Sequence, residues 1–270
     1  MHSAAGIGLD EVRQVYSSAE GDLWELLMGH QIHVGGLRSS IDLAERACIG
    51  AGMRGVDLCC CNGAGMRFLV RLRNVASMTG VDATPAVVER GRARCRAEGL
   101  DDRITLLLAD ACATGLPGGC ADFVWGEDAW CYVEDKPRLV AEAVRLVRPG
   151  GVVAFTDWVE GRGGLSPAEA ERLFRFMKFP NVQSLAGYSQ LLEQAGCEVS
   201  EAADTGRFAP HLELYMQMAQ MQLTYDVLRI LDFDMKALEA ISGEMASMIE
   251  LGRAGKLIQG RFIARKRSNA

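Results

Sequence analysis

Between residues 54 and 160 the chain alternates short apolar segments with longer segments of helical periodicity. Alternation of this kind is typical of parallel strands that share one sheet and are joined by helices covering both of its faces. The pattern therefore predicts an α/β protein with a Rossmann-like, doubly wound and mostly parallel sheet. The expected strands are 55–60, 77–83, 104–110, 121–128 and 151–159, and the expected helices are 66–75, 85–99 and 135–147.

The segments on either side of this core have mainly helical patterns. Residues 1–53 read as helical, 166–202 predict two helices, and 209–252 predict long amphipathic helices rich in methionine. Residues 258–266 predict a closing strand. We therefore expect an N-terminal helical cap on the substrate side (1–53), a Rossmann-like core (54–165), and a helical lid with C-terminal strands that complete the sheet (166–270).

Charge and composition exclude several classes of partner. The 270-residue chain has a formal net charge of −6, and its longest Lys/Arg run is the RKR at 265–267, so nucleic acid is not expected. The opening MHSAAGIGLDEV lacks a signal-peptide pattern, and no apolar stretch is long enough to span a bilayer. We expect a cytoplasmic protein without membrane contact. Its nine cysteines are odd in number and partly adjacent, which favours reduced thiols.

The stretch VDLCCCNGAG at 56–65 has the layout of a nucleotide-binding loop whose first glycines are replaced. Asp57 closes an apolar run, and a turn then leads through two glycines into an apolar helix. Such a strand, turn and helix present backbone N–H groups and a helix N-terminus to a ligand. Asp82 and Asp110 end the next two expected strands, where Asp82 can bind both hydroxyls of a ribose and Asp110 can lie beside a purine ring. Three strand-end acids together predict a nucleoside site.

These segments closely resemble the class I S-adenosylmethionine-dependent methyltransferases, whose loop usually runs acid-x-Gly-x-Gly-x-Gly. Asp57 matches the acid, Cys59 and Cys61 stand at two glycine positions, and Gly63 and Gly65 remain. The resemblance implies the class I methyltransferase fold, with S-adenosylmethionine as cofactor and S-adenosylhomocysteine as product. The cofactor-binding residues that it implies are Asp57, Cys59, Cys61, Gly63, Asp82, Ala83, Asp110, Ala111 and Glu127.

The cysteines decide how well this loop can hold a cofactor. Glycine serves there for unusual backbone angles and close approach of the ligand. With a negative φ at Cys59 and Cys61 the loop keeps its shape and the pocket is slightly tighter, whereas a positive φ costs on the order of 1 kcal/mol or more. We expect small, buried side chains and retained binding. Metal or redox chemistry is the rival interpretation, but no CxxC or matching His spacing accompanies the cysteines, so we expect no metal.

Further segments narrow the resemblance to the sarcosine and dimethylglycine methyltransferases. Residues 126–158 are similar to the acidic and aromatic turn of these enzymes and to the helix and strand that follow it. The segment MGHQIHVGG at 28–36 is similar to their substrate-side segment, and residues 245–266 are similar to their closing helix and strand. Gln31 departs from the acid that is usual there. The resemblance implies methyl transfer to the nitrogen of a small methylated amine such as sarcosine or dimethylglycine. Thiol, phosphoethanolamine-like and apolar or aromatic acceptors stay open, as does a protein that binds the cofactor without methylating.

Methyl transfer from a sulfonium mainly needs an in-line arrangement and a group that takes a proton from the attacking amine. The candidate catalytic residues are His30, His33 and Tyr16, for which packing or capping is the alternative. Aromatic faces could hold a methylated ammonium by cation–π attraction, but no cation stands out for an amino-acid carboxylate. The expected partner is a small molecule, with a homodimer as a candidate assembly. The candidate substrate-binding residues are Trp24, Trp130, Tyr132, Trp158 and Tyr188.

Overall fold

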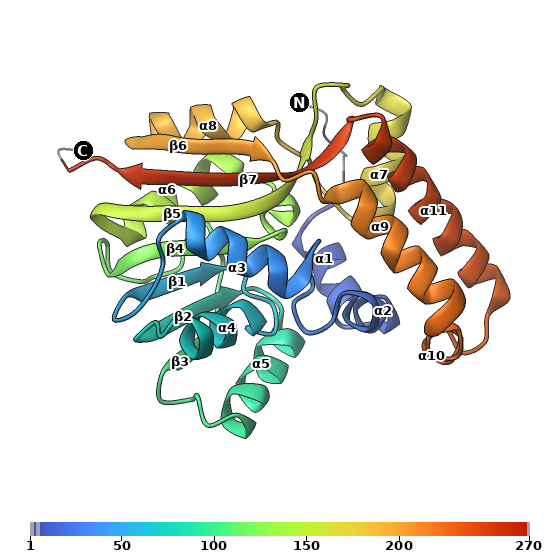
Figure 1. Ribbon diagram of the computed structural model, residues 1–270, viewed down its shortest axis with the longest axis horizontal. Helices are drawn as coiled ribbons and strands as arrows, with labels where there is room; N and C mark the ends of the chain where they lie inside the picture. Colours follow the sequence, from blue (N-terminus) through green and yellow to red (C-terminus); the bar gives the residue numbers. More distant parts are fainter. Residues whose placement is uncertain (1–2, 4–5, 269–270) are drawn as a thin grey trace.

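Seven strands of the described chain form one sheet in the order β3-β2-β1-β4-β5-β7-β6 (Figure 1). The structure is a computed structural model that describes residue 3 and residues 6–268. Strands β1 to β5 pair in parallel, and β7 is antiparallel to both of its neighbours, which confirms the predicted fold class. The strands are β1 Arg54–Leu58, β2 Ser77–Asp82, β3 Ile104–Leu108, β4 Ala121–Glu127, β5 Val147–Glu160, β6 Cys197–Asp204 and β7 Leu257–Lys266.

Helices cover both faces of the sheet, and others form a lobe at one of its ends (Figure 1). Helices α3, α4 and α5 pack on one face, and α6 and α8 on the other. None of the described helices combines the length and the apolarity needed to cross a membrane. The sheet-covering helices are α3 Gly36–Arg46, α4 Ala64–Leu72, α5 Pro85–Ala97, α6 Lys136–Leu146 and α8 Leu185–Gln194; the lobe contains α1 Leu9–Tyr16, α2 Ala19–Met28, α7 Pro167–Met177, α9 Phe208–Gln217, α10 Thr224–Ile230 and α11 Met235–Arg253.

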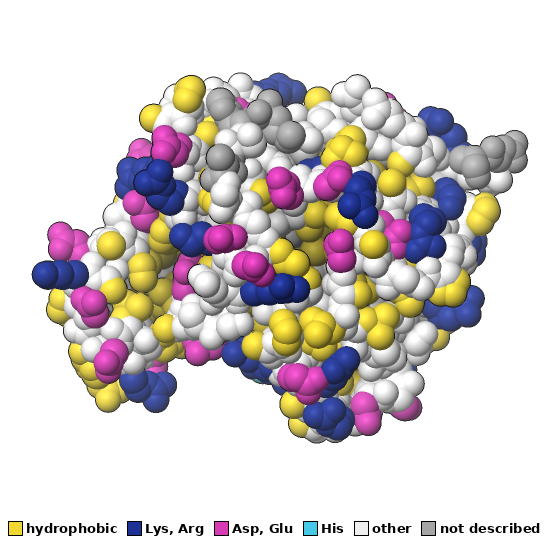
Figure 2. Space-filling model, turned by 180° about the vertical axis from the view of Figure 1, so that it is seen from behind, with side chains coloured by type: hydrophobic (Ala, Val, Ile, Leu, Met, Phe, Trp, Pro, Cys, Tyr) yellow, Lys and Arg dark blue, Asp and Glu magenta, His cyan; other side chains and the backbone are white. Residues whose placement is uncertain are grey.

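Seen from behind, a notch separates the helical lobe from the body of the sheet (Figure 2). On this face acidic and basic side chains are interspersed rather than gathered by sign. The lobe has its own apolar core, built from α2, α7, α9 and α11 together with the end of β5. The cap and the lid therefore pack on each other as well as on the sheet.

Side chains alternate across the sheet, which explains why its central strands read as apolar throughout. In β4, Trp125 packs toward α3 and α4, whereas its neighbour Val124 faces the opposite layer. On that second face Phe155 lies between Trp130 and Phe262, with ring centroids 3.9 Å and 4.6 Å away. Both faces of the central strands are thus sealed by helices and aromatic rings, as is usual for parallel sheets.

Three features differ from the sequence expectations. Helix α6 ends at Leu146 and Val147 is already extended, so RPGG lies within β5 rather than between helix and strand. Strand β3 ends at Leu108, which leaves Asp110 two residues beyond the strand. Strand β6 lies in a region whose pattern predicts helices. It is an edge strand with mostly half-exposed side chains, so it lacks an apolar signal.

Gly55 in β1 tests the packing of this core. A Cβ at Gly55 would overlap Phe123 Cζ and lie 2.6 Å from Met78 Sδ, and the buried ring cannot yield. We expect Gly55→Ala to lower the free energy of unfolding by about 1–3 kcal/mol, as measured by urea denaturation. Gly243→Ala in α11 is the matched control, because a Cβ there meets nothing within 4 Å and alanine favours a helix. Equal losses in both variants would contradict the packing argument.

Candidate functional site

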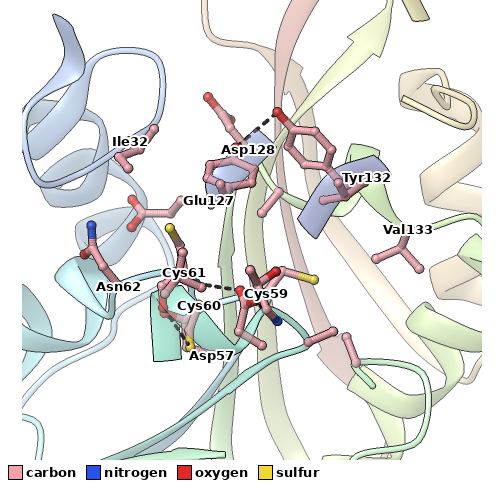
Figure 3. A pocket seen from close by; sticks show the side chains of 18 of the residues that line it. Ile32, Asp57, Cys59, Cys60, Cys61, Asn62, Glu127, Asp128, Tyr132 and Val133 are labelled. Atoms are coloured by element: carbon pink, nitrogen blue, oxygen red, sulfur yellow. Dashed lines mark hydrogen bonds between the residues drawn. The ribbon is translucent and has the colours of Figure 1, made fainter. Parts of the chain in front are cut away.

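A cavity of about 290 Å³ opens where β1, β2 and β4 end (Figure 3). The carboxyl ends of parallel strands are where open α/β sheets bind ligands. Helix α1 closes one side, with Leu9, Val12 and Tyr16 in the lining, and Arg13 Nε ties this helix to the end of β2 by a 2.9 Å hydrogen bond to Ala83 O. The predicted cofactor residues that line the cavity are Asp57, Cys59, Cys61, Asp82, Ala83, Asp110, Ala111 and Glu127.

Gly63 differs from the other predicted cofactor residues because it does not line the cavity. It is the N-cap of α4, with a φ of 75° in the left-handed region. A Cβ at this position would also lie 2.9 Å from Met66 Cε. Gly63 therefore turns the chain into α4, and the first residues of that helix, Ala64 and Gly65, enter the cavity wall.

Asp82 ties the loop after β1 to the loop after β2. Its Oδ2 accepts a 2.9 Å hydrogen bond from Cys61 N, and its Oδ1 accepts one of 2.9 Å from Thr84 N. Burial raises the pKa of Asp82, while these backbone donors act in the opposite direction. The carboxylate thus sets the shape of the cysteine loop from the neighbouring strand.

The cysteine loop adopts the backbone angles that favour glycine. Cys59 has a φ of 62° and Cys61 a φ of 48°. Both values are positive, so both residues carry the backbone strain that a side chain causes in this region. Both side chains line the cavity (Figure 3). Burial raises the pKa of the Cys61 thiol to about 12, so this thiol stays protonated and unreactive at neutral pH. The described residues contain no group of three or more His, Cys, Asp or Glu that could hold a metal ion.

Two carboxylates meet beside the N-terminus of α4. A Cβ on Gly65 would lie 2.7 Å from Glu127 Oε2 and 3.7 Å from Asp57 Oδ2. Burial, with added repulsion from Glu127 and Asp82, raises the pKa of Asp57 well above its usual range. This part of the cavity therefore favours a ligand that brings positive charge.

His33 forms a buried pair with Glu127. Its Nε2 lies 3.2 Å from Glu127 Oε1 and 3.1 Å from Ser40 Oγ. Ser40 Oγ donates to Glu127 Oε1 at 2.7 Å, and as an acceptor it serves both the imidazole and Gln31 Nε2, the latter at 3.2 Å. These acceptors select the tautomer with its proton on Nε2. Nδ1 has no hydrogen-bond partner although the residue is only 4% exposed, so no neighbouring group occupies its lone pair.

The two predicted catalytic histidines lie in different surroundings. His30 also lines the cavity, but its side chain is 67% exposed and its Nε2 is 3.7 Å from Glu25 Oε1. Its carbonyl oxygen accepts a hydrogen bond from Asn62 Nδ2 at 3.2 Å. His30 therefore lies at the mouth of the cavity, whereas His33 lies inside.

A smaller inner cavity, walled by aromatic rings, adjoins His33. It has about 20 Å³ of free space, roughly that of one water molecule. Tyr16 Oη donates to Tyr132 Oη at 3.1 Å, and both rings, like His33, line the two cavities together. Trp158 meets Phe179 edge to face, with ring centroids 5.6 Å apart. The inner lining consists of Tyr16, Trp24, Met28, Ile32, His33, Asp128, Tyr132, Trp158, Met177 and Phe179.

Trp130 and Tyr188 lie elsewhere, which corrects their assignment to the substrate site. The indole of Trp130 is fully buried under β4, where a Cβ on Gly126 would overlap it. Tyr188 Oη donates to the buried Asp157 Oδ2 at 2.7 Å. Trp130 and Tyr132 belong to the same 3₁₀ turn, Trp130–Tyr132, whose successive side chains point in different directions. Tyr132 therefore reaches the cavity, whereas Trp130 does not.

Asp128 directly follows Glu127 at the end of β4 and was identifiable from that position, whereas Asn62 and Phe179 were missed. Asn62 follows the three cysteines, and its buried Oδ1 has no hydrogen-bond partner. Phe179 enters the inner cavity from the loop after α7, where no local pattern marks it.

Comparisons with known proteins agree with this geometry. A model of a methyltransferase domain matches residues 56–155. Methyltransferase GfsG of Streptomyces halstedii is 30% identical over 172 residues, which are 63% of this chain but only 61% of that relative. The 27-O-demethylrifamycin SV methyltransferase of Amycolatopsis mediterranei is 30% identical over 205 residues, 70% of this chain and 75% of the relative. The structure of a provisionally assigned sarcosine dimethylglycine methyltransferase from Galdieria sulphuraria superposes with a TM-score of 0.75 at 25% identity, over 86% of each chain.

The chain belongs to the class I S-adenosylmethionine-dependent methyltransferases. Other solved structures of this fold, with TM-scores of 0.83 and 0.81, hold S-adenosylhomocysteine or S-adenosylmethionine. The predicted family, fold and cofactor are thereby confirmed, whereas the acceptors in these names differ from one protein to the next.

The strain at the cysteine loop is open to measurement. A positive φ costs a residue with a Cβ about 1–2 kcal/mol, while glycine costs about 0.5–1 kcal/mol through the entropy of the unfolded chain. We therefore expect Cys59→Gly and Cys61→Gly each to raise the free energy of unfolding by about 0.5–1 kcal/mol, the difference between these terms. Cys60→Gly is the control, since Cys60 is buried without a positive φ and should lose stability. A loss at all three positions would show that strain is not the controlling term.

Proposed function

We propose that this chain transfers a methyl group from S-adenosylmethionine in the larger cavity to the nitrogen of a small methylated amine in the inner cavity. The observation that carries the proposal is the unpartnered Nδ1 of His33, a buried ring that lines both cavities. Because His33 lines both the cavity proposed for the donor and the cavity proposed for the acceptor, its ring is within reach of the reacting atoms. In this arrangement helices α1, α2 and α7, with the loops after α2 and α7, cap the acceptor.

The larger cavity suits a cationic nucleoside donor. Asp82 is placed to bind ribose hydroxyls, and Asp57, Glu127 and the orphaned Oδ1 of Asn62 can receive the amino-acid part with its ammonium group. When bound, S-adenosylmethionine supplies an electrophilic methyl group. The sulfur that carried this group keeps the bonding electrons and becomes a neutral thioether. The described lining residues include one Arg, Arg138, and seven acids: Asp57, Asp82, Asp110, Glu127, Asp128, Glu134 and Asp135.

The inner cavity suits a small ammonium group. Rings of Tyr, Trp and Phe present faces that attract a methylated ammonium, and the carboxylate of Asp128 adds negative charge. Its described lining contains no Lys or Arg, so a carboxylate on the acceptor would be buried without a partner. Amines without a carboxylate therefore fit better than sarcosine or dimethylglycine. The little free space means that an acceptor must displace side chains, and Met28 and Met177 are the flexible members of the wall.

His33 supplies the base that such an acceptor needs. A protonated amine has no lone pair for attack, so its proton must first be removed. In this proposal the proton passes from the acceptor nitrogen to Nδ1. Ser40 and Glu127 hold Nε2–H on the opposite side of the ring, and the Glu127 carboxylate stabilises the imidazolium that forms.

A hydroxyl group on an apolar molecule is the second candidate acceptor. Two observations favour it: the inner wall is largely apolar, and one relative is named for methylation of 27-O-demethylrifamycin SV. The same base would then take the proton from oxygen. The two candidates differ in whether positive charge on the acceptor contributes to binding.

The acceptor class is tested by product mass. We expect N,N-dimethylethanolamine to gain one methyl group, and dimethylglycine to react at least about tenfold more slowly because its carboxylate stays unpaired. A simple phenol and a simple thiol complete the panel, and methylation of the phenol alone would favour the second candidate. Calorimetry with S-adenosylhomocysteine supplies the independent control. Failure to bind it would mean that the cysteine loop has lost the cofactor, whereas binding without any methylated product would point to another reaction.

The role of His33 is tested by substitution. We expect His33→Gln to lower kcat for N,N-dimethylethanolamine about 10²- to 10⁴-fold, the usual contribution of a general base, with the affinity for S-adenosylhomocysteine nearly unchanged. His30→Gln is the matched control, since the exposed His30 ring lies at the mouth of the cavity. Comparable losses in both variants, or a loss confined to cofactor affinity, would contradict the assignment.

A further inference from the structure

We propose that Gln259 of β7 is the positioning residue of the His33–Glu127 pair, an inference that rests on the proposed role of His33. Gln259 holds the residue that follows each member of the pair: Val34 after His33, and Asp128 after Glu127. One side chain from the last strand thereby fixes the distance between base and carboxylate.

The contacts form a closed, buried ring of three residues. Gln259 Nε2 donates to Val34 O at 2.9 Å and to Asp128 Oδ1 and Oδ2 at 3.0 Å and 2.8 Å. Asp128 Oδ2 in turn accepts from Val34 N at 2.9 Å. Gln259 and Val34 are 0% exposed and Asp128 is 6% exposed. Both polar backbone groups of Val34 are therefore satisfied by side chains that lie far away in sequence.

The orientation of the Gln259 amide is fixed by Thr205. Thr205 Oγ1 donates to Gln259 Oε1 at 2.8 Å, so the oxygen faces Thr205 and the NH₂ group faces Asp128 and Val34. An amide can accept on one side and donate twice on the other. A carboxylate at this position would face the carboxylate of Asp128 and the carbonyl of Val34 without a proton to donate. The site is therefore specific for glutamine by charge as well as by shape.

The held segment needs support from outside itself. Asp128 has a φ of 51°, a strained value for a residue with a side chain. Burial raises the pKa of its carboxyl group, and the donors from Val34 and Gln259 counteract this. On the other side of Val34, Gly35 N donates to Tyr215 Oη of α9 at 3.0 Å. The loop that carries His33 is thus held by β7 and by the helical lobe.

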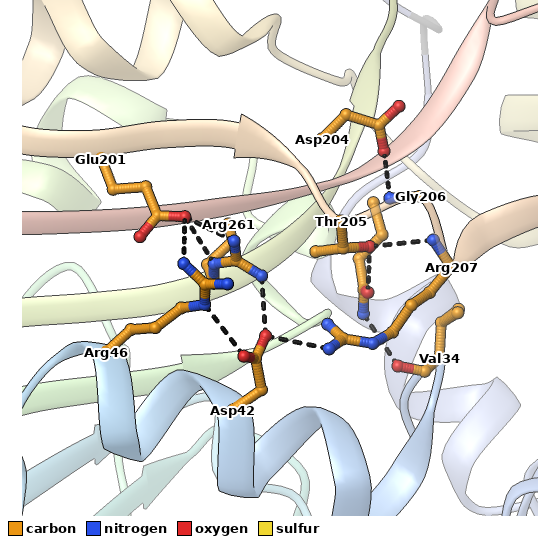
Figure 4. Close-up of polar contacts among 10 residues, drawn as sticks. Val34, Asp42, Arg46, Glu201, Asp204, Thr205, Gly206, Arg207 and Arg261 are labelled. Atoms are coloured by element: carbon orange, nitrogen blue, oxygen red, sulfur yellow. Dashed lines mark hydrogen bonds and ion pairs between the residues drawn. The ribbon is translucent and has the colours of Figure 1, made fainter.

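An ion-pair network keeps β7 in register with the helix that carries Ser40 (Figure 4). Arg261 lies two residues beyond Gln259, and its Nη1 is 2.7 Å from Asp42 of α3. Its Nη2 pairs with Glu201 of β6 at 2.5 Å. Because Arg261 is buried, these pairs order the strand more than exposed pairs would. The strand that carries Gln259 is therefore itself held to α3 by the ion pair between Arg261 and Asp42.

The experiment reads the imidazole of His33 directly. The ring nitrogens of ¹⁵N-histidine-labelled protein, saturated with S-adenosylhomocysteine, are observed by NMR, and His33 is assigned by its loss in His33→Gln. In Gln259→Met, which keeps the length of the side chain but removes its donors and acceptor, we expect the His33 signals to shift and the ring N–H to exchange faster. With N,N-dimethylethanolamine, kcat should fall on the order of 10- to 100-fold with little change in KM, because the base is displaced rather than removed.

Two further variants keep the test decisive. Thr205→Val leaves the Nε2 contacts but frees the amide to turn, so its His33 signals should move less and in the same direction, even if Gln259→Met does not fold. Lys266→Met is the control on the same strand, because its ammonium lies seven residues beyond Gln259 and donates to Val144 O and Val147 O. His33 signals that stay unchanged in Gln259→Met and Thr205→Val, or that shift equally in Lys266→Met, would overturn the inference. If the wild type fails to methylate the amine, the proposed function fails, while the NMR comparison still decides the role of Gln259.

Discussion

Buried negative charge is the constraint to which the rest of this structure responds. Parallel pairing of β1, β2 and β4 brings Asp57, Asp82 and Glu127 to one edge of the sheet, where little water is left to solvate them. Backbone donors hold Asp82, and Ser40 with His33 holds Glu127.

The raised pKa values of Asp57 and Asp82 mean that the folded protein keeps protons that the unfolded chain would release. Their effect on stability is therefore favourable at low pH and is lost as the pH rises through the raised values. A cationic ligand relieves the same repulsion, which links the charge of the cavity to the charge of the donor.

The cysteine loop shows how far such a site can depart from its usual sequence. Cys59 and Cys61 keep the left-handed backbone that glycine normally provides, and Asp82 fixes the loop through the N–H group of Cys61. The side chains that cysteine adds do not change the backbone conformation of the loop. They place two protonated, polarisable sulfur atoms at the wall that a methionine-like chain would touch. The local strain is thus retained by contacts from the next strand.

Much of this arrangement could be predicted from the sequence because it depends on local periodicity. Strand ends follow from the length of apolar runs, so the acids at Asp57 and Asp82 were identifiable, and their convergence follows from parallel pairing. The sign of φ at Cys59 could not be predicted, because a neighbouring strand sets it. The same holds for Trp130, which turns under the sheet although it lies two residues from Tyr132 in the cavity. Nor does any local pattern bring Phe179 into the inner cavity.

Gln259 shows the same limit in a different way. A polar residue in an otherwise apolar strand is visible in the sequence, but its partners are not. Val34 lies 225 residues away and Asp128 lies 131 residues away. Only the antiparallel insertion of β7 next to β5 brings these three together. The position of the loop that carries His33 thus depends on topology that periodicity does not encode.

The place of β7 in the chain has a consequence for how the protein matures. A ribosome releases residues from the N-terminus onward, so the walls of the donor cavity, formed by β1, β2 and β4, emerge well before residue 259. All the lining residues of this cavity lie between residues 8 and 138, so they are synthesised well before the side chain that holds the loop bearing the imidazole. The proposed anchoring of that loop therefore arises only after β7 has been synthesised and has paired antiparallel with β5 and β6.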